Sequence, residues 1–228
     1  MPSKADPGAT SGAKPRAPLS LDRVLSAAIS LADEGGIESL SMRKLAQTLG
    51  VEAMTLYYYA ANKDDILNGI VDIVVGEMKP ATQGGDWKAA LRESAISAHE
   101  VLLRHPWACA FMMSPARIRP ARLRFIDAAL RTIAEAGFSA RLTYLAYHAF
   151  DSHILGFTLW EVGYSAGMAE PPTFMPDFLE TLPVEYPHLA RHADQHLTRL
   201  DLHDNEREYE FGLDLILDGF EKLRDASN

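Results

Sequence analysis

The spacing of the apolar residues is the feature that most constrains what this chain can fold into. From Asp86 onward, apolar residues recur three and four positions apart, as on one face of a helix, and Gly or Pro ends several of the runs. No segment alternates apolar and polar residues as a half-buried strand would, and no internal repeat is visible. The pattern therefore predicts an all-α fold.

Capping residues and glycines divide the chain into expected helices. Ser20, Ser41 and Ser139 are placed to accept a backbone N–H at a helix start, while Gly50 and Gly137 are placed to end a helix. The helices expected on this basis are 21–34, 42–49, 53–59, 63–78, 87–104, 120–136, 140–164 and 205–224. The segment 140–164 is apolar nearly all round, which indicates a buried helix.

Charge and composition separate the start of the chain from the rest. Residues 1–18 are rich in Pro, Ala, Gly and Ser and have no apolar core, so we expect a disordered tail and no secretory signal. Through Lys63 the charge is roughly +1, whereas the whole chain carries −9. The acidic balance argues against coating nucleic acid with the whole surface, but it leaves a local basic patch open. We place a domain boundary in the fourth helix, between 19–66 and 67–228.

Several classes of protein lack their required features in this sequence. No run of about 18 apolar residues is available to span a bilayer, because the most apolar stretch contains His148, Asp151 and His153. The single Cys109 excludes an internal disulfide and fits a reducing cytoplasm. A Gly-rich phosphate loop and a zinc-type His pair are absent, so we expect no cofactor, no metal and no enzymatic activity.

Helices 42–49 and 53–59, joined across Gly50 and Val51, have the proportions of a helix-turn-helix. On spacing alone, a short helical hairpin of any other kind is equally open. The segment 53–59 also contains three adjacent tyrosines, which cannot all lie on one helical face. Some of these rings must therefore be exposed.

The stretches "GIESLSMRKLAQTLGV" and "TLYYYAANKDDIL" resemble the tetracycline-repressor (TetR) family of bacterial transcriptional regulators. The most specific part is Leu56-Tyr57, followed by further aromatic residues and a Lys that opens the fourth helix. The later stretches "YHAFDSHILGF" and "YEFGLDLILDG" are similar to the ligand-binding half of one branch of that family. The resemblance implies an N-terminal three-helix helix-turn-helix DNA-binding domain, followed by a larger helical domain for ligand binding and dimerisation.

In the family the third helix lies in the major groove of DNA, which would account for exposed tyrosines. By resemblance, the implied DNA-binding residues are Arg43, Ala53, Met54, Thr55, Tyr57, Tyr58, Tyr59 and Lys63. Thr55, Tyr57 and Lys63 would reach phosphates, while Leu56 packs inward. The alternative for each tyrosine is a packing role, and for Lys63 a solvated charge.

This chain departs from the family pattern around the third helix. Glu52 stands where Ser or Thr commonly caps it, so the helix is expected to form poorly without DNA, and Ala60 replaces a frequent Phe. Between Ala53 and Tyr59 there is no Arg, Lys, Asn or Gln, the side chains that read guanine and adenine by paired hydrogen bonds. Base selection must then rest on thymine methyls, on hydroxyls, on Arg43 and on DNA shape.

The last helix is suited to joining two copies of the chain. Besides its core stripe it carries a second set of apolar and small residues, namely Phe211, Leu215, Gly212 and Gly219. The resemblance implies that this helix and segment 140–164 form a four-helix dimer interface. The alternative is that both helices belong to the core of a monomer.

The larger domain has candidate ligand-binding residues of mixed character. They are Trp107, Phe111, Met112, Tyr144, His148, Asp151, Phe157 and Trp160. Plain core is the alternative for each of them. We expect no metal site here, because His153 faces away from His148 and Asp151, and we expect these two to be buried and bonded to each other.

The sequence thus predicts a cytoplasmic homodimer that binds a double-stranded DNA operator and is released by a small-molecule effector, most simply as a repressor. The identity of the effector is open. The alternative is a helical carrier of small molecules that does not bind DNA.

Overall fold

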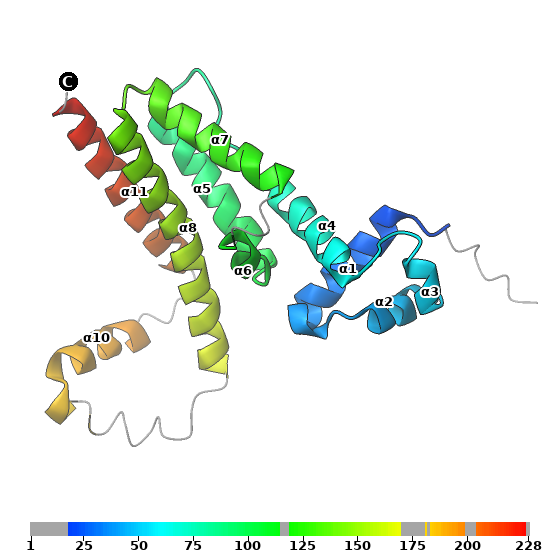
Figure 1. The fold of residues 1–228 in the computed structure, drawn as a ribbon. Coiled ribbons are helices and arrows are strands. Elements are labelled where there is room, and N and C mark those ends of the chain that lie inside the picture. Colours follow the sequence, from blue (N-terminus) through cyan, green and yellow to red (C-terminus); the bar gives the residue numbers. More distant parts are fainter. Residues whose placement is uncertain (1–17, 115–118, 170–180, 182, 199–203, 227–228) are drawn as a thin grey trace, which may run out of the picture.

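The structure, a computed structural model, describes residues 18–114, 119–169, 181, 183–198 and 204–226. Every regular element among these residues is helical, which confirms the all-α class. The expected disordered tail, residues 1–18, lies outside the described residues except for Pro18. Figure 1 shows a small N-terminal group of helices joined to a longer helical body.

The N-terminal group contains α1 (Leu21–Gly35), the short 3₁₀ helix η1 (Ile37–Ser39), α2 (Met42–Leu49), α3 (Ala53–Leu56) and α4 (Lys63–Gly76). The predicted caps are confirmed, since Ser20 Oγ accepts from Arg23 N at 3.3 Å and Ser41 Oγ accepts from Lys44 N at 3.2 Å. Gly50 ends α2 with φ 68° and ψ 38°, a conformation that costs other residues more than glycine. Helix α4 has a cap that sequence reasoning missed, because Asn62 Oδ1 accepts from Asp65 N at 2.9 Å.

The prediction of about seven residues for the third helix was wrong. Helix α3 has 4 residues, and Glu52 makes no capping hydrogen bond with its side chain. From Tyr57 to Tyr59 each backbone N–H bonds the carbonyl three residues earlier, so the chain tightens into a turn instead of continuing as an α-helix. Leu56 is fully buried and anchors this turn to the core.

The larger body contains α5 (Trp87–Arg104), α6 (Ala108–Met112), α7 (Pro120–Glu135), α8 (Ala140–Ala169), α10 (Pro187–Thr198) and α11 (Asp204–Asp225). Helix α6 was not expected as a separate element. Helix α8 packs against α5, α7 and α11, as a central helix should. The prediction of a buried helix, made because the segment is apolar nearly all round, was wrong for the single chain, because Tyr144, Leu145 and Trp160 are exposed on it.

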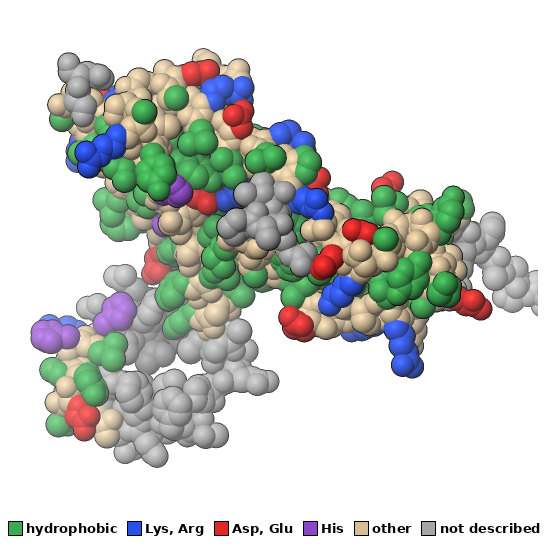
Figure 2. All heavy atoms as spheres, in the orientation of Figure 1, with side chains coloured by type: hydrophobic (Ala, Val, Ile, Leu, Met, Phe, Trp, Pro, Cys, Tyr) green, Lys and Arg blue, Asp and Glu red, His purple; other side chains and the backbone are tan. Residues whose placement is uncertain are grey.

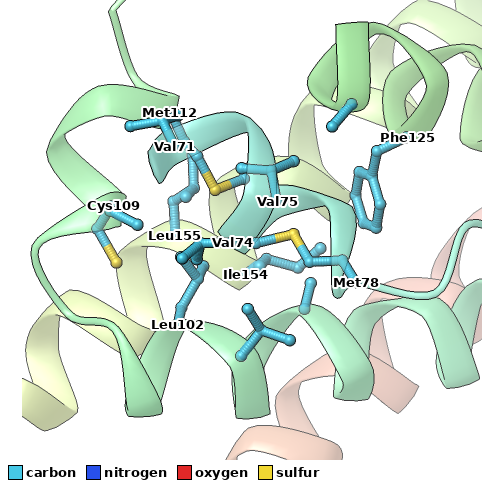
Figure 3. Close-up of a cluster of buried hydrophobic side chains, with 14 of the residues drawn as sticks. Val71, Val74, Val75, Met78, Leu102, Cys109, Met112, Phe125, Ile154 and Leu155 are labelled. Atoms are coloured by element: carbon cyan, nitrogen blue, oxygen red, sulfur yellow. The ribbon is translucent and has the colours of Figure 1, made fainter. Parts of the chain in front are cut away.

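Helix α4 belongs to both halves of the molecule. Its first half packs on α1 so closely that a Cβ on Gly69 would lie 2.8 Å from Leu25 Cδ2. Its second half enters the core of the larger body, where Figure 3 shows Val71, Val74, Val75 and Met78 among Leu102, Cys109, Met112, Phe125, Ile154 and Leu155. The predicted boundary between 66 and 67 thus falls inside one continuous helix.

Within the described ranges, no helix is long and apolar enough to cross a membrane.

Candidate nucleic-acid interface and ligand site

Large side chains are held in water on α3 and the turn that follows it. The exposed fraction is 75% for Met54, 48% for Tyr57 and 88% for Tyr58, directly beside the fully buried Leu56. Ala53 and Thr55 are also exposed, as is Arg43 at the start of α2. Because such apolar area is costly to leave in water, this surface is arranged for contact with a partner.

The three tyrosines take different positions. Tyr58 is the most exposed of them and Tyr57 is about half exposed, and all three rings line a groove of about 450 Å³ between α1 and α4, together with Leu21 and Leu25. Tyr59 is half-buried, and its hydroxyl donates to the Leu19 carbonyl at 2.9 Å. This hydrogen bond ties the chain before α1 to the turn after α3, so Tyr59 makes a packing contact within the chain, and its contact with DNA stays a prediction.

The charges around α3 suit an anionic partner in a local way only. Arg43 and Lys44 are exposed in the first turn of α2, and Lys63 begins α4. Guanidinium, ammonium and hydroxyl groups are the donors that contact phosphate oxygens in protein–DNA complexes. The surface can therefore bind a phosphate backbone although the chain as a whole is acidic.

The predicted ligand-binding residues do not form one cluster. Trp107 directly precedes α6, which carries Phe111 and Met112, and the rings of Trp107 and Phe111 lie 6.2 Å apart. Tyr144 and His148 lie on the exposed start of α8, with ring centroids 4.3 Å apart. Phe157 and Trp160 form a third set further along α8, with their rings 5.5 Å apart.

The expected pairing of a buried His148 with Asp151 was wrong. His148 is exposed, and Asp151 instead accepts two hydrogen bonds from Arg122 Nη2, at 2.6 and 2.7 Å. Arg122 is buried on α7, and Nη1 of its guanidinium has no acceptor among the described residues. Burial, followed by the charge of Asp151, raises the pKa of Tyr147 to about 12. Arg122, on another helix, therefore pairs with the Asp151 carboxylate that the spacing along α8 had assigned to His148.

A buried polar cluster at the junction of α5, α8 and α11 was missed by sequence reasoning. His99 Nδ1 lies 2.8 Å from Thr158 Oγ1, and its Nε2 lies 3.2 Å from Glu161 Oε2. The imidazole stacks on Tyr209 at 3.9 Å, and the Tyr209 hydroxyl donates to the Ala95 carbonyl at 2.9 Å. A signal was available, because His99 falls three and four positions from apolar residues of the α5 stripe, at a core position.

Burial, with a smaller contribution from His153, lowers the pKa of His99 from 6.5 to about 4. The imidazole is therefore neutral at physiological pH. The Cys109 thiol is also buried, and burial raises its pKa to about 11, so it is an unreactive thiol near neutrality. In the part of the chain that the structure describes, no group of three His, Cys, Asp or Glu residues could hold a metal ion.

Apolar side chains remain uncovered along α11 and α8. Phe211 is 66% exposed and Leu215 is 57% exposed. Figure 2 shows hydrophobic side chains gathered over these two helices. A Cβ on Gly219 would have no neighbouring atom within 4 Å, whereas a Cβ on Gly212 would lie 2.7 Å from His153 Cε1. Gly212 thus admits α8 of the same chain, and the uncovered surface rests on the two large side chains.

The N-terminal helices also make polar contacts with the larger body. Asp33, near the end of α1, accepts from Trp107 Nε1 at 2.7 Å, and its Oδ1 lies 2.8 Å from His105 Nδ1. On α4, Asp72 Oδ1 accepts from Ala121 N, at the start of α7, at 2.8 Å. The two halves are therefore connected by α4 itself and by side chains on either side of it.

Comparison with known proteins gives matches over almost the whole chain. Residues 24–70 match the bacterial regulatory proteins of the tetR family, and residues 79–224 match the tetracyclin repressor-like C-terminal domain. An HTH-type transcriptional regulator of Saccharopolyspora erythraea is 34% identical over 184 residues, which are 75% of this chain and 74% of the relative. The class D tetracycline repressor protein of Escherichia coli is 32% identical over 208 residues, 89% of each chain.

Solved structures agree with these relatives. A possible TetR family transcriptional regulator from Streptomyces coelicolor A3(2) superposes with a TM-score of 0.71 at 29% identity, over 90% of this chain and 100% of the other. The N-terminal helices α1 to α4, which we call the reader, and the larger helical body therefore have the same fold as regulators whose structures are solved.

Proposed function

Because the chain belongs to the tetracycline-repressor (TetR) family of bacterial transcriptional regulators, we propose that it represses its target genes by binding a palindromic operator as a homodimer. As a member of this family it is a helix-turn-helix DNA-binding regulator and not an enzyme. The observation that carries the proposal is the exposure of Met54, Tyr57 and Tyr58 beside the buried Leu56. A side chain that must reach a DNA groove has to stand in water when DNA is absent.

In the proposed complex α3 enters the major groove. The contact residues are Arg43, Ala53, Met54, Thr55, Tyr57, Tyr58 and Lys63. Hydroxyls and cations bind phosphates, and the Met54 side chain meets thymine methyl groups. Tyr59 also serves to position α3, because its hydroxyl is engaged by the Leu19 carbonyl.

A single reader this small would bind DNA weakly, and a two-fold dimer places two readers on half-sites at a fixed spacing. We propose that Phe211 and Leu215 of α11, with Gly219 and the exposed Leu145 of α8, form the dimer interface. Their exposure in the single chain supports this assignment. Gly212 contributes through the close packing of α11 on α8 within each protomer.

We propose further that a small-molecule effector binds the larger domain and releases the DNA in the cytoplasm. Trp107, with Phe111 and Met112 of α6 and Phe157 and Trp160 of α8, are the proposed contacts. Tyr144, His148 and Asp151 remain candidates, although Asp151 is engaged by Arg122. One relative is by name a tetracycline repressor, so tetracyclines are the first compounds to screen.

The proposal is tested by selecting bound fragments from random duplex DNA with the purified full-length protein and then following affinity against salt. Enrichment of an inverted repeat, with affinity falling as salt rises, is expected of a dimeric reader that releases counterions. A Tyr57→Ala, Tyr58→Ala double variant is the control and should enrich nothing. A wild-type protein that stays monomeric and enriches no sequence would favour the carrier alternative.

A further inference from the structure

The end of α1 is fastened to the junction between α5 and α6. The Asp33 carboxylate accepts the Trp107 indole N–H at 2.7 Å and contacts His105 Nδ1 at 2.8 Å. These partners lie more than seventy residues away in sequence, and they belong to the larger domain. The contact therefore joins the DNA-binding domain to the effector domain at a point separate from α4.

Each member of this contact depends on the others. Trp107 is 8% exposed, so its N–H would be buried without an acceptor if Asp33 moved away. The Asp33 side chain is 29% exposed and the His105 side chain 12% exposed, so the carboxylate interacts in a partly dry environment. A hydrogen bond to an ionised acceptor is stronger than a neutral one, and partial burial increases that difference.

Trp107 is also one of the proposed effector contacts. It precedes α6, and its ring contacts that of Phe111 at 6.2 Å. Met112, on the same short helix, packs among the α4 residues Val71 and Val75 (Figure 3). The interior is close-packed, so a molecule that binds against the side chains of Trp107, Phe111 and Met112 must displace the Trp107 ring, the α6 backbone or both.

A second carboxylate lies at the same corner. Glu77, which follows α4, accepts from Arg104 Nη2 at 2.9 Å and lies 3.8 Å from His105 Nε2. His105 thus stands between Asp33 of α1 and Glu77 beyond α4. The corner fixes the ends of two reader helices relative to α5 and α6.

We propose that Asp33, His105 and Trp107 form an interdomain latch that holds the reader in its DNA-binding orientation, and that an effector releases it by moving Trp107. This inference rests on the proposed function. The latch requires the indole ring of Trp107 in its buried position, and an effector that binds against Trp107, Phe111 and Met112 moves the ring out of that position. The latched arrangement therefore belongs to the effector-free, DNA-binding state, and breaking the latch mimics the effector.

The test measures affinity for the operator duplex selected by the wild-type protein, with Trp107→Phe as the first variant. This change removes the indole N–H and keeps an aromatic ring. Affinity should fall about five-fold or more, the lower range of couplings between sites. Trp87→Phe is the matched control, because Trp87 lies in the same domain but packs on Phe138 and does not contact the latch. It should bind within about two-fold of wild type.

A double-mutant cycle separates the latch from a general loss of stability. Asp33→Ala should weaken DNA binding at least as much as Trp107→Phe, because it removes the His105 contact as well as the indole hydrogen bond, and adding Trp107→Phe to Asp33→Ala should weaken binding no further. Asp33→Asn keeps an acceptor and should lose less. Multiplying effects in the double variant, or wild-type affinity in Trp107→Phe, would overturn the latch.

Two further results keep this test distinct from that of the proposed function. A wild-type protein that binds no duplex refutes the function itself, whereas normal wild-type binding with unaffected variants refutes only the latch. Should Trp107→Phe not fold, Asp33→Asn and Asp33→Ala carry the test. In these variants the exchange of the Trp107 indole proton should speed up, and unchanged protection in Asp33→Ala would contradict the hydrogen bond.

Discussion

The DNA-binding domain exposes large apolar and aromatic side chains, whereas the effector domain buries polar and charged ones. In the first, Met54 and Tyr58 stand in water beside a buried Leu56. In the second, His99 and Arg122 are buried and have their partners on neighbouring helices. The contrast follows from what each domain must do, since a reader meets a partner at its surface and a receptor changes from within.

The difference teaches where substitutions separate function from stability. An exposed side chain contributes little to folding, so its removal tests binding alone. A buried polar group is stabilised only through its partner, and removing that partner leaves a desolvated group without compensation. Four pairs of substitutions test this comparison, from the largest expected effect to the smallest.

Asp151→Ala should give the largest loss of stability, about 3–5 kcal/mol, because it leaves the buried Arg122 guanidinium without its carboxylate. Chemical denaturation of the purified protein measures the free energy of unfolding. Asp214→Ala is the control, since its pair with Arg92 is half exposed, and it should cost less than about 1 kcal/mol. Equal losses in the two variants would show that the Arg122–Asp151 pair is not effectively buried.

Leu56→Ala and Tyr58→Ala, two residues apart, should behave oppositely. Removing the fully buried Leu56 side chain should cost about 2–5 kcal/mol of stability. Removing Tyr58, which is exposed, should change the unfolding free energy by less than about 0.5 kcal/mol while weakening DNA binding. A large loss of stability in Tyr58→Ala would mean that this ring packs rather than contacts DNA.

The buried His99 should make stability depend on pH. Its folded pKa is lowered to about 4, so between pH 6.5 and 4 the unfolded chain holds a proton that the folded chain lacks. Stability attributable to His99 is therefore full above pH 6.5 and falls by up to about 3 kcal/mol as the pH drops to 4.

His99→Gln should lose this part of the pH dependence, whereas His148→Gln, at an exposed position, should keep it. Denaturation at a series of pH values compares the three proteins. Parallel curves for wild type and His99→Gln would contradict a neutral buried imidazole.

Lys63→Ala should have the smallest effect. If Lys63 binds a phosphate, affinity should fall about equally on all DNA sequences, and the salt slope should decrease by about one. Lys79→Ala removes an exposed ammonium group from the larger domain and should leave the slope unchanged. An unaltered slope in Lys63→Ala would remove this residue from the DNA contacts.

Much of the reader was predictable because its determinants are local. Ser20 and Ser41 cap the starts of α1 and α2 and Gly50 ends α2, as expected, and the family resemblance predicted that the tyrosine segment contacts DNA. The length of α3 was not predictable from its apolar pattern. Without a capping side chain at Glu52, the segment keeps 4 helical residues, and i to i+3 turns complete it.

Prediction was poorest for polar partners in the larger domain. His148 and Asp151 are at bonding distance along a helix in principle, yet Arg122 of α7 took the carboxylate. The spacing within one helix states which residues share a face, and it says nothing about which helix covers that face. His99 fell at a core position, but its contacts with Thr158 and Glu161 required α8 to be placed beside α5.

The sequence by itself determined the helical class, the ends of most helices, the reader and the family, because these depend on residues within a few turns of one another. Only the tertiary structure decided the Arg122–Asp151 pair, the His99 cluster and the contact of Asp33 with Trp107. Each of these joins groups from different helices. Burial then makes the choice of partner decisive, since a polar group removed from water is stable only where a complementary group has been brought to it.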